Sequence, residues 1–216
     1  MTLIQENGSP AVLVQHYEKC FQRHGSTAQG VDWPNAADTL LRHKIMAELW
    51  ESKGVNPRSI VDVGCGYGAF LDYLLTNSKQ AARGYSGIDL SEPMIEWARK
   101  AYPSHPFTCQ DILKTPLNDN QFEYGVMNGV LTEKLNLSFE HMETFAHRII
   151  KTLFQACRHG IAFNVMSSHV DWQRDDLFHL PLDRLADFLT KNCSRHWQIR
   201  HDYGLYEYTV YVYPQP

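Results

Sequence analysis

A glycine-rich turn near residue 64 contains the first residues whose types and spacing could do chemistry. It reads Val61-Asp62-Val63-Gly64-Cys65-Gly66-Tyr67-Gly68 and lies where a short apolar run gives way to a helix-like stretch. Glycine suits such a turn because the backbone can bend tightly and no Cβ keeps a bound molecule away from the main chain. The turn therefore predicts a site for a small bound molecule at the end of a first strand.

The spacing of this turn leaves two classes of ligand to distinguish. Gly64, Gly66 and Ala69 satisfy the G-x-G-x-x-G/A fingerprint of dinucleotide-binding proteins, so an NAD-linked oxidoreductase is one interpretation. Against it, Asp62 stands at the strand end, where dinucleotide enzymes usually carry an apolar residue, and Gly68 opens the loop further. A lone G-x-G pattern is weak, so the residues after the turn must decide.

Two later stretches complete the pattern. Gly87-Ile88-Asp89-Leu90-Ser91 ends a second apolar run and opens a helix, so the joint sequence is VDVGCGYG, then GIDLSEPMIEWAR, then CQDI. Residues from about Ile60 to Phe163 thereby resemble the class I S-adenosylmethionine-dependent methyltransferases. The resemblance implies that the chain binds S-adenosylmethionine and transfers its methyl group, with S-adenosylhomocysteine as the product.

The resemblance also assigns residues to the methionine and ribose ends of the cofactor. Asp62 would hold the glycine loop and orient the ammonium group, although a purely structural role is the alternative. Asp89 would accept hydrogen bonds from both ribose hydroxyls, because a carboxylate suits two neighbouring donors. The loop beneath the methionine part would consist of Gly64, Cys65, Gly66 and Gly68.

The adenine and the reactive sulfonium would lie beside later strand ends. By the resemblance, Asp111 receives the adenine amino group, the Ile112 amide contacts the ring, and Leu90 and Ile112 sandwich it. Asn128 and Gly129 would lie beside the sulfonium. A strand-end asparagine also commonly bonds the backbone of its own turn, so this second interpretation of Asn128 stays open.

The region before the turn is expected to form a lid. In similar methyltransferases a tyrosine or arginine from such helices touches the methionine carboxylate, which makes Tyr17 and Arg42 the candidates here. Arg42 is preferred because a guanidinium pairs a carboxylate bidentately, and a solvated helix-surface charge is its alternative. Trp33 is expected to pack in the core rather than to line the pocket.

The acceptor wall is expected after the fifth strand, between Asn164 and His179, because open sheets bind ligands at the carboxyl ends of strands. His169 is the candidate general base, since histidine titrates near neutrality, but eleven histidines dilute that signal. The expected reaction is in-line displacement onto an oxygen or nitrogen atom of a small-molecule acceptor. A methyltransferase acting on protein or nucleic acid, and a non-catalytic S-adenosylmethionine-binding subunit, remain alternatives.

The secondary structure that must position these residues alternates between helices and short strands. Caps and turn residues mark most of the boundaries, including Gly25, Ser91 and Gly204. The sequence predicts helices over 11–24, 35 onwards, 69–77, 91–102, 138–157 and 181–191. It predicts strands over 59–63, 84–89, 107–110, 122–127, 160–166, 197–201 and 206–213.

This alternation predicts one α/β domain with a Rossmann-like, doubly wound sheet. The sheet should be mostly parallel with an antiparallel C-terminal strand, with helices on both faces. Residues 1–54 should form N-terminal helices that act as a lid within the same domain, and residues 55–216 the cofactor-binding core.

Composition excludes several other classes of protein. The formal net charge is −4, with 20 Lys and Arg against 24 Asp and Glu, so a nucleic-acid partner is not expected. No apolar run approaches the roughly 20 residues that span a bilayer, and the first 15 residues do not resemble a secretory signal. The five cysteines form no C-x-x-C pair, so no metal site or disulfide framework is predicted. The sequence thus favours a cytoplasmic monomer or homodimer.

Overall fold

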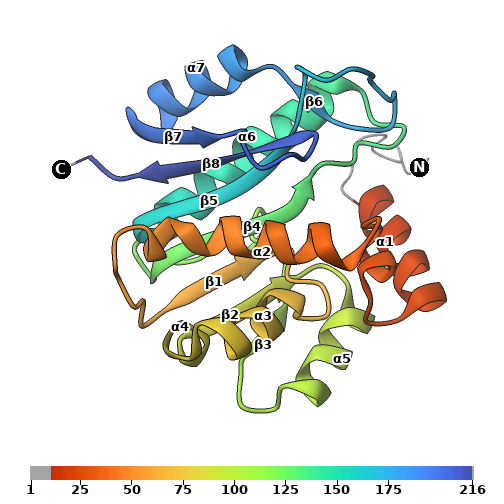
Figure 1. The fold of residues 1–216 in the computed structure, drawn as a ribbon, viewed down its shortest axis with the longest axis vertical. Helices are drawn as coiled ribbons and strands as arrows, with labels where there is room; N and C mark the ends of the chain where they lie inside the picture. Colours follow the sequence, from red (N-terminus) through yellow and green to blue (C-terminus); the bar gives the residue numbers. More distant parts are fainter. Residues whose placement is uncertain (1–10, 216) are drawn as a thin grey trace, which may run out of the picture.

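The computed structural model describes residues 11–215, which form a central sheet of eight strands covered by helices (Figure 1). Residues 1–10, on which the expectation about a secretory signal largely depended, lie outside the described residues. The strands, in sheet order, are β3 (Phe107–Cys109), β2 (Tyr85–Asp89), β1 (Ile60–Val63), β4 (Phe122–Leu131), β5 (Cys157–Ser167), β8 (Glu207–Tyr213) and β7 (His196–Arg200), with β6 (His179–Leu180) beside β5.

The pairing directions confirm the predicted sheet. β1 pairs in parallel with β2 and β4, and the parallel pairing continues to β3 on one side and β5 on the other. β8 is antiparallel to both β5 and β7, so the C-terminal hairpin inserts its last strand between β5 and β7. Successive strands run from β1 outward to β3 on one side of the sheet, and from β4 to β5 on the other side. The boundary between β1 and β4 is therefore the topological switch point, where α/β folds usually bind ligands.

Helices cover both faces of the sheet, and each face has its own apolar core. On one face, α2 (Ala36–Glu51), α3 (Ala69–Asn77), α4 (Lys79–Arg83) and α5 (Glu92–Ala101) pack over strand residues such as Ile60 and Val126. On the other, α6 (Phe139–Ala156) and α7 (Leu182–Asn192) pack over Val61 and Met127. The alternation Ile60, Val61 along one strand follows the two-residue period of a β-strand.

Side-chain caps explain why the main helices begin where the sequence predicts. Asn35, Ser91 and Ser138 each accept a hydrogen bond from the backbone N–H three residues later, which satisfies a donor left free at the helix start. Four apolar residues at helical spacing, Met142, Phe145, Ile149 and Leu153, share one face of α6, and Met142, Ile149 and Leu153 are buried. The fourth of them, Phe145, is only partly buried because it faces a cavity described below.

Some elements and boundaries were not predicted. The short elements α4 and β6 carry too few residues for a clear hydrophobic period. β4 was expected to end at Met127 but continues to Leu131, with a break in its register to β5 between those residues. Gly129 has a φ of +85°, a conformation that glycine adopts without steric penalty, so the strand bends there and resumes its pairing.

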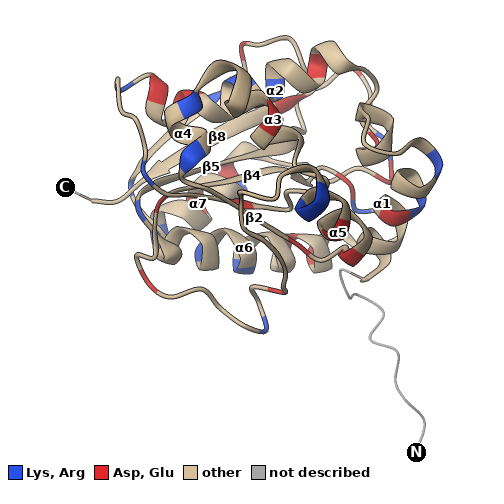
Figure 2. Cartoon of the chain, turned by 90° about the horizontal axis from the view of Figure 1, so that it is seen from below, with Lys and Arg blue, Asp and Glu red and all other residues tan. Residues whose placement is uncertain are grey.

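The first described helix, α1 (Ala11–His24), and the 3-10 helix η1 (Ala28–Val31) lie beside the carboxyl ends of the strands (Figure 1). Basic and acidic positions are interspersed over the helices (Figure 2). Among residues 11–215, no helix is both long enough and apolar enough to cross a membrane.

Candidate functional site

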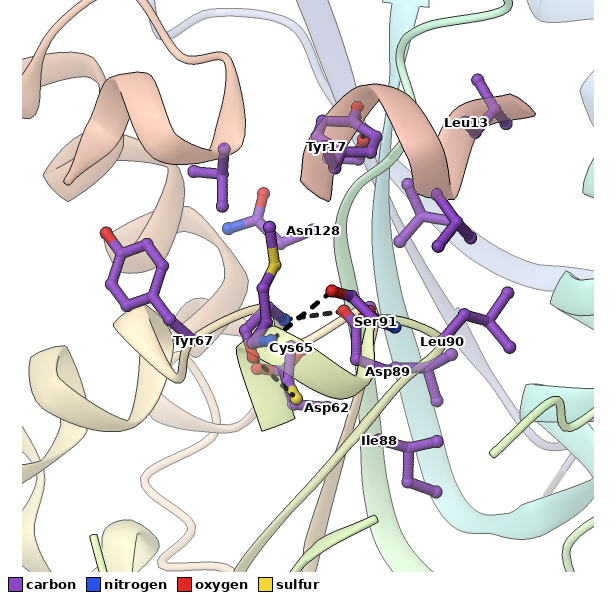
Figure 3. A pocket seen from close by; sticks show the side chains of 18 of the residues that line it. Leu13, Tyr17, Asp62, Cys65, Tyr67, Ile88, Asp89, Leu90, Ser91 and Asn128 are labelled. Carbon is purple, nitrogen blue, oxygen red and sulfur yellow. Dashed lines mark hydrogen bonds between the residues drawn. The ribbon is translucent and has the colours of Figure 1, made fainter. Parts of the chain in front are cut away.

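A cavity opens at the switch point, between the carboxyl ends of β1, β2 and β4 and the N-terminal elements α1 and η1. In Figure 3, Tyr17 and Leu13 of α1 lie on one side of it, and Asp62, Cys65 and Asp89 on the other. The structure thus brings most of the predicted cofactor residues together: Tyr17, Asp62, Gly64, Cys65, Gly66, Asp89, Leu90, Asp111, Ile112, Asn128 and Gly129 all line the cavity.

The glycine turn is held against the end of β2. The backbone N–H groups of Gly64 and Cys65 both donate to the carbonyl of Ile88, at 2.8 and 3.2 Å. Gly64 has a φ of +78°, and a Cβ built there would lie 2.1 Å from a methyl carbon of Val130. A side chain at position 64 is therefore excluded both by the backbone conformation and by β4.

Asp89 ties the glycine turn to the start of α5. Its two carboxylate oxygens accept hydrogen bonds from the backbone N–H groups of Gly66 and Ser91, each at 2.8 Å. Burial raises the pKa of the carboxyl, while these N–H donors act in the opposite direction. Each carboxylate oxygen can accept a second hydrogen bond, so Asp89 can hold the loop and still bind donors of a ligand.

Asp62 is the second acid of the cavity and is almost completely buried, with 2% of its surface exposed. The hydroxyl of Tyr85 donates to it at 2.7 Å. Burial raises the pKa of Asp62 from 3.8 to about 7, although the Tyr85 hydrogen bond lowers it. A positively charged ligand group would stabilise the ionised form of this carboxyl, which makes the wall suited to a cation.

The third acid lies on the other side of Asp89. Asp111 follows β3 and accepts a hydrogen bond from the backbone N–H of Leu113 at 2.9 Å. Lys114 approaches its second oxygen at 3.5 Å. Leu90, Ile112 and Phe145 of α6 add apolar surface to the cavity wall.

Asn128 presents the most unusual polar group of the cavity. Both its amide oxygen and its amide nitrogen are buried and have no hydrogen-bond partner among the described residues. The side chain therefore does not bond its own turn, which was the alternative interpretation. Because a buried unpaired amide is unfavourable, an orphaned amide in a cavity indicates a polar ligand.

Gly129, next to Asn128, is fixed by a buried network. Its N–H donates to the side chain of Asn164 at 2.7 Å, and Asn164 in turn donates to Glu207 at 3.0 Å. The hydroxyl of Tyr17 donates to the Gly129 carbonyl at 3.4 Å, which connects α1 to β4. Asn164, expected in an acceptor wall, is fully buried inside the sheet instead.

Two predicted cofactor residues do not line the cavity. Arg42 donates through Nε to both oxygens of Glu207, at 3.0 and 2.9 Å. The guanidinium of Arg42 thus pairs with the buried Glu207 carboxylate of β8. We had expected it to pair with a ligand carboxylate. Gly68 has a φ of +90° at the start of α3, and a Cβ there would meet Tyr102 at 3.0 Å and Phe107 at 3.1 Å. Gly68 therefore packs against these two rings instead of lining the cavity.

The predicted base, His169, is also outside the cavity lining. It is exposed, and its backbone N–H bonds the hydroxyl of Ser167. The neighbouring Trp172 is exposed as well, and its ring packs against Tyr206. His179 is engaged through both ring nitrogens, with the Ser167 carbonyl at 2.7 Å and the Arg174 N–H at 3.3 Å. His169 does not line the cavity, so the structure does not bring it together with the predicted cofactor residues.

Several aromatic residues of the cavity were missed, Trp33 and His43 among them. Trp33 was expected in the core, but its indole packs against Gly129, where a Cβ would come within 3.0 Å of the ring. His43 of α2 is buried beside Trp33 and Phe70, and burial lowers its pKa to about 3, so the imidazole is neutral. The N-terminal region carried no local motif that could have marked either residue.

Comparison with known proteins shows that the chain is similar to methyltransferases. The sequence profile of the methyltransferase domain matches residues 60–160. A protein of Mycobacterium tuberculosis named as a methyltransferase is 32% identical over 159 residues, which cover 73% of this chain and 93% of that protein. The malonyl-[acyl-carrier protein] O-methyltransferase of Pseudescherichia vulneris is 26% identical over 160 residues, 70% of this chain and 57% of that enzyme.

A solved structure shows the same fold over almost the whole chain. The magnesium protoporphyrin IX methyltransferase of Synechocystis PCC 6803, crystallised with S-adenosylhomocysteine, superposes with a TM-score of 0.65. The alignment covers 96% of this chain and 100% of that one at 13% sequence identity.

Proposed function

Because this chain belongs to the class I S-adenosylmethionine-dependent methyltransferase family, we propose that it methylates an oxygen or nitrogen atom of a small-molecule acceptor by in-line displacement. The observation that carries the proposal is the set of polar groups around one apolar cavity. The buried carboxyl of Asp62, the half-buried carboxyl of Asp89 and the unpartnered amide of Asn128 face it from three neighbouring strand ends. This set suits a ligand with positive charge and several hydrogen-bond donors.

We place the cofactor along this wall by the chemistry of the side chains. Asp89 accepts the ribose hydroxyls, Leu90 and Ile112 enclose the adenine, and Asp111 receives its amino group. Asp62 faces the ammonium group, and the backbone of Gly64 and Gly66 leaves room for the methionine part. Asn128 and Gly129 border the reacting end.

The chain contributes to catalysis mainly through position. S-adenosylmethionine supplies a methyl group on a positively charged sulfur, which is reactive without further activation. The cavity therefore needs to hold two molecules in line and exclude water, an effect worth up to roughly 7–11 kcal/mol. Residues 11–34 act as the lid in this proposal, since Tyr17, Val31 and Trp33 close the cavity opposite the glycine turn.

Three observations favour a small acceptor. The cavity wall near Gly129 is aromatic and apolar, with Tyr17 and Trp33 on it. Acidic and basic residues are interspersed rather than gathered into a basic stripe (Figure 2). Two similar proteins are named for a malonyl group carried on a protein and for magnesium protoporphyrin IX.

Calorimetric titration with S-adenosylhomocysteine tests the cofactor site. We expect Asp89→Asn to weaken binding by about 10- to 150-fold, because one of two charged acceptor oxygens is replaced by an amide donor. The matched control is Asp187→Asn, which alters an exposed carboxylate on α7 paired with Lys191. A folded Asp89→Asn protein with unchanged affinity, or a wild-type protein that binds NAD instead, would contradict the proposal.

The acceptor class requires a second experiment. The protein is incubated with S-adenosylmethionine carrying a labelled methyl group and with separate pools of metabolites, proteins and nucleic acids. We expect label only in the metabolite pool. Label in protein or nucleic acid would assign the alternative acceptor class, and cofactor binding without transfer to any pool would indicate a non-catalytic subunit.

A further inference from the structure

Three side chains with metal-binding atoms converge outside the cavity, between α1 and the residue that follows η1. His16 and Cys20 come from α1, and Asp32 comes from the connection to α2. The His16 Nε2 atom lies 2.7 Å from an Asp32 carboxylate oxygen and 3.8 Å from the Cys20 sulfur. All three ligand atoms lie within 4.8 Å of one another.

The fold places these residues together by two local devices. His16 and Cys20 are four residues apart on one helix, so their side chains share a face. Asp32 has a φ of 57°, and its N–H is held by the carbonyls of Ala28 and Gln29. The connection then lies so close to the end of α1 that a Cβ on Gly30 would be 1.9 Å from the Gly25 carbonyl oxygen.

The separations are close to those of a tetrahedral zinc site. With zinc bonds of about 2.3 Å to sulfur and about 2.0–2.2 Å to nitrogen and oxygen, the sulfur and nitrogen ligands lie about 3.6 Å apart and the nitrogen and oxygen ligands about 3.4 Å apart. The observed 3.8 Å between Cys20 and His16 nearly matches. The Asp32 carboxylate, at 2.7 Å from His16, must move back by about 0.7 Å.

We propose that His16, Cys20 and Asp32 form a binding site for a divalent transition metal of the zinc type, with a fourth position open to water. Imidazole, thiolate and carboxylate are the ligands that zinc takes in proteins, and three protein ligands with one open position is a common arrangement. A mixed set of this kind favours zinc over magnesium or calcium, which prefer oxygen ligands.

The surrounding charges favour a cation. The negative charge of Glu133 acts on Cys20, and the negative charge of Asp32 acts on both Cys20 and Glu133. Two positive charges act in the opposite direction, that of Arg23 on Cys20 and that of Arg174 on Glu133. The site is also accessible, because the His16 and Asp32 side chains are 29% and 44% exposed.

A metal here would fix the lid. α1 supplies Leu13, Val14 and Tyr17 to the cavity wall, and the connection supplies Val31 and Trp33 on either side of Asp32. Binding of one ion by both segments would hold these two parts of the wall in a fixed relation. The metal site goes beyond the proposed methyl transfer and does not depend on it.

The first test is spectroscopic titration of the ligand-free protein with Co²⁺, followed by displacement with Zn²⁺. We expect one ion per chain, with a sulfur-to-cobalt charge-transfer band that Cys20→Ser abolishes. His16→Ala and Asp32→Asn should each weaken binding by about tenfold or more. The matched controls, Cys193→Ser and His24→Ala, remove the same side-chain types elsewhere and should leave the titration unchanged. No charge-transfer band, or a band that persists in Cys20→Ser, overturns the proposal.

The second test is limited trypsin digestion, which reports on the lid without any activity measurement. We expect Zn²⁺ to slow cleavage after Lys19 and Arg23 in the wild type at least about tenfold and to have no such effect in Cys20→Ser. Equal protection of both proteins contradicts the proposed link. Calorimetry with S-adenosylhomocysteine on the same samples separates the two proposals, since loss of metal binding alone leaves the cofactor site in place.

Discussion

Asp62 gives the sharpest test of the cavity because its replacement by asparagine changes charge with little change in shape. The side chain is 2% exposed and accepts the Tyr85 hydroxyl at 2.7 Å. An asparagine carbonyl can accept the same hydrogen bond, and its NH₂ group takes the place of the protonated carboxyl oxygen. Asp62→Asn therefore mimics permanently protonated Asp62.

The expected effect on stability follows from the raised pKa. The carboxyl titrates at about 7 in the folded protein and at 3.8 in the reference state. Below 3.8 both states hold the proton, so the acid form stabilises the fold fully. Between pH 3.8 and pH 7 the carboxyl loses its proton in the unfolded chain but keeps it in the folded protein. The free energy of unfolding therefore falls by about 1.4 kcal/mol per pH unit. Above 7 the loss reaches an upper limit of about 4 kcal/mol, which Asp62→Asn avoids.

Urea unfolding of both proteins between pH 4.5 and 8, without ligand, measures this difference. We expect the free energy of unfolding of Asp62→Asn, relative to that of wild type, to rise by about 3 kcal/mol between pH 4.5 and pH 8. The other titrating groups are the same in both proteins, so their contributions cancel in the comparison. Tyr85→Phe should extend the pH dependence to higher pH, since its hydroxyl lowers the pKa of Asp62. A stability difference that stays constant within about 0.5 kcal/mol over the whole range would refute the reasoning.

Three further predictions follow from the same structure. Gly66→Val should abolish S-adenosylhomocysteine binding in calorimetry, because the backbone φ is +54° and the new Cβ would point at Val31 of the cavity wall, 3.4 Å away; a folded variant that binds normally would place the cofactor elsewhere. Arg42→Ala should lose about 3–5 kcal/mol in urea unfolding, since it leaves the buried Glu207 carboxylate without an opposite charge and with only the Asn164 hydrogen bond, and an unchanged midpoint would contradict this. His169→Ala should keep turnover within about threefold of wild type in the labelled-methyl assay, and a tenfold loss would restore it as the base.

The sequence by itself determined the order of the main elements and the residues of the glycine turn. Helix starts at Asn35, Ser91 and Ser138 were predictable because a cap depends on a side chain and a backbone group only three residues apart. The glycine turn and Asp89 were predictable for a similar reason, since a strand-to-helix turn is a local structure. Their convergence at one edge then follows from the parallel pairing of the strands.

Only the tertiary structure decided which side chains of the flanking helices face the cavity. Arg42 and His43 are neighbours, yet successive residues on a helix point about 100° apart, and packing of α2 turns His43 inward and Arg42 toward Glu207. Glu207 lies 165 residues away along the chain, so no local pattern could reveal the pair.

The cluster of His16, Cys20 and Asp32 shows the same limit. His16 and Cys20 have a helical spacing that the sequence displays, but one helix contributes only two ligands. The third depends on how tightly the connection folds back at Gly30, which is a matter of close backbone contact rather than of residue type. Local chemistry along the chain is readable from the sequence, whereas contacts between distant segments depend on the packing that only the folded structure provides.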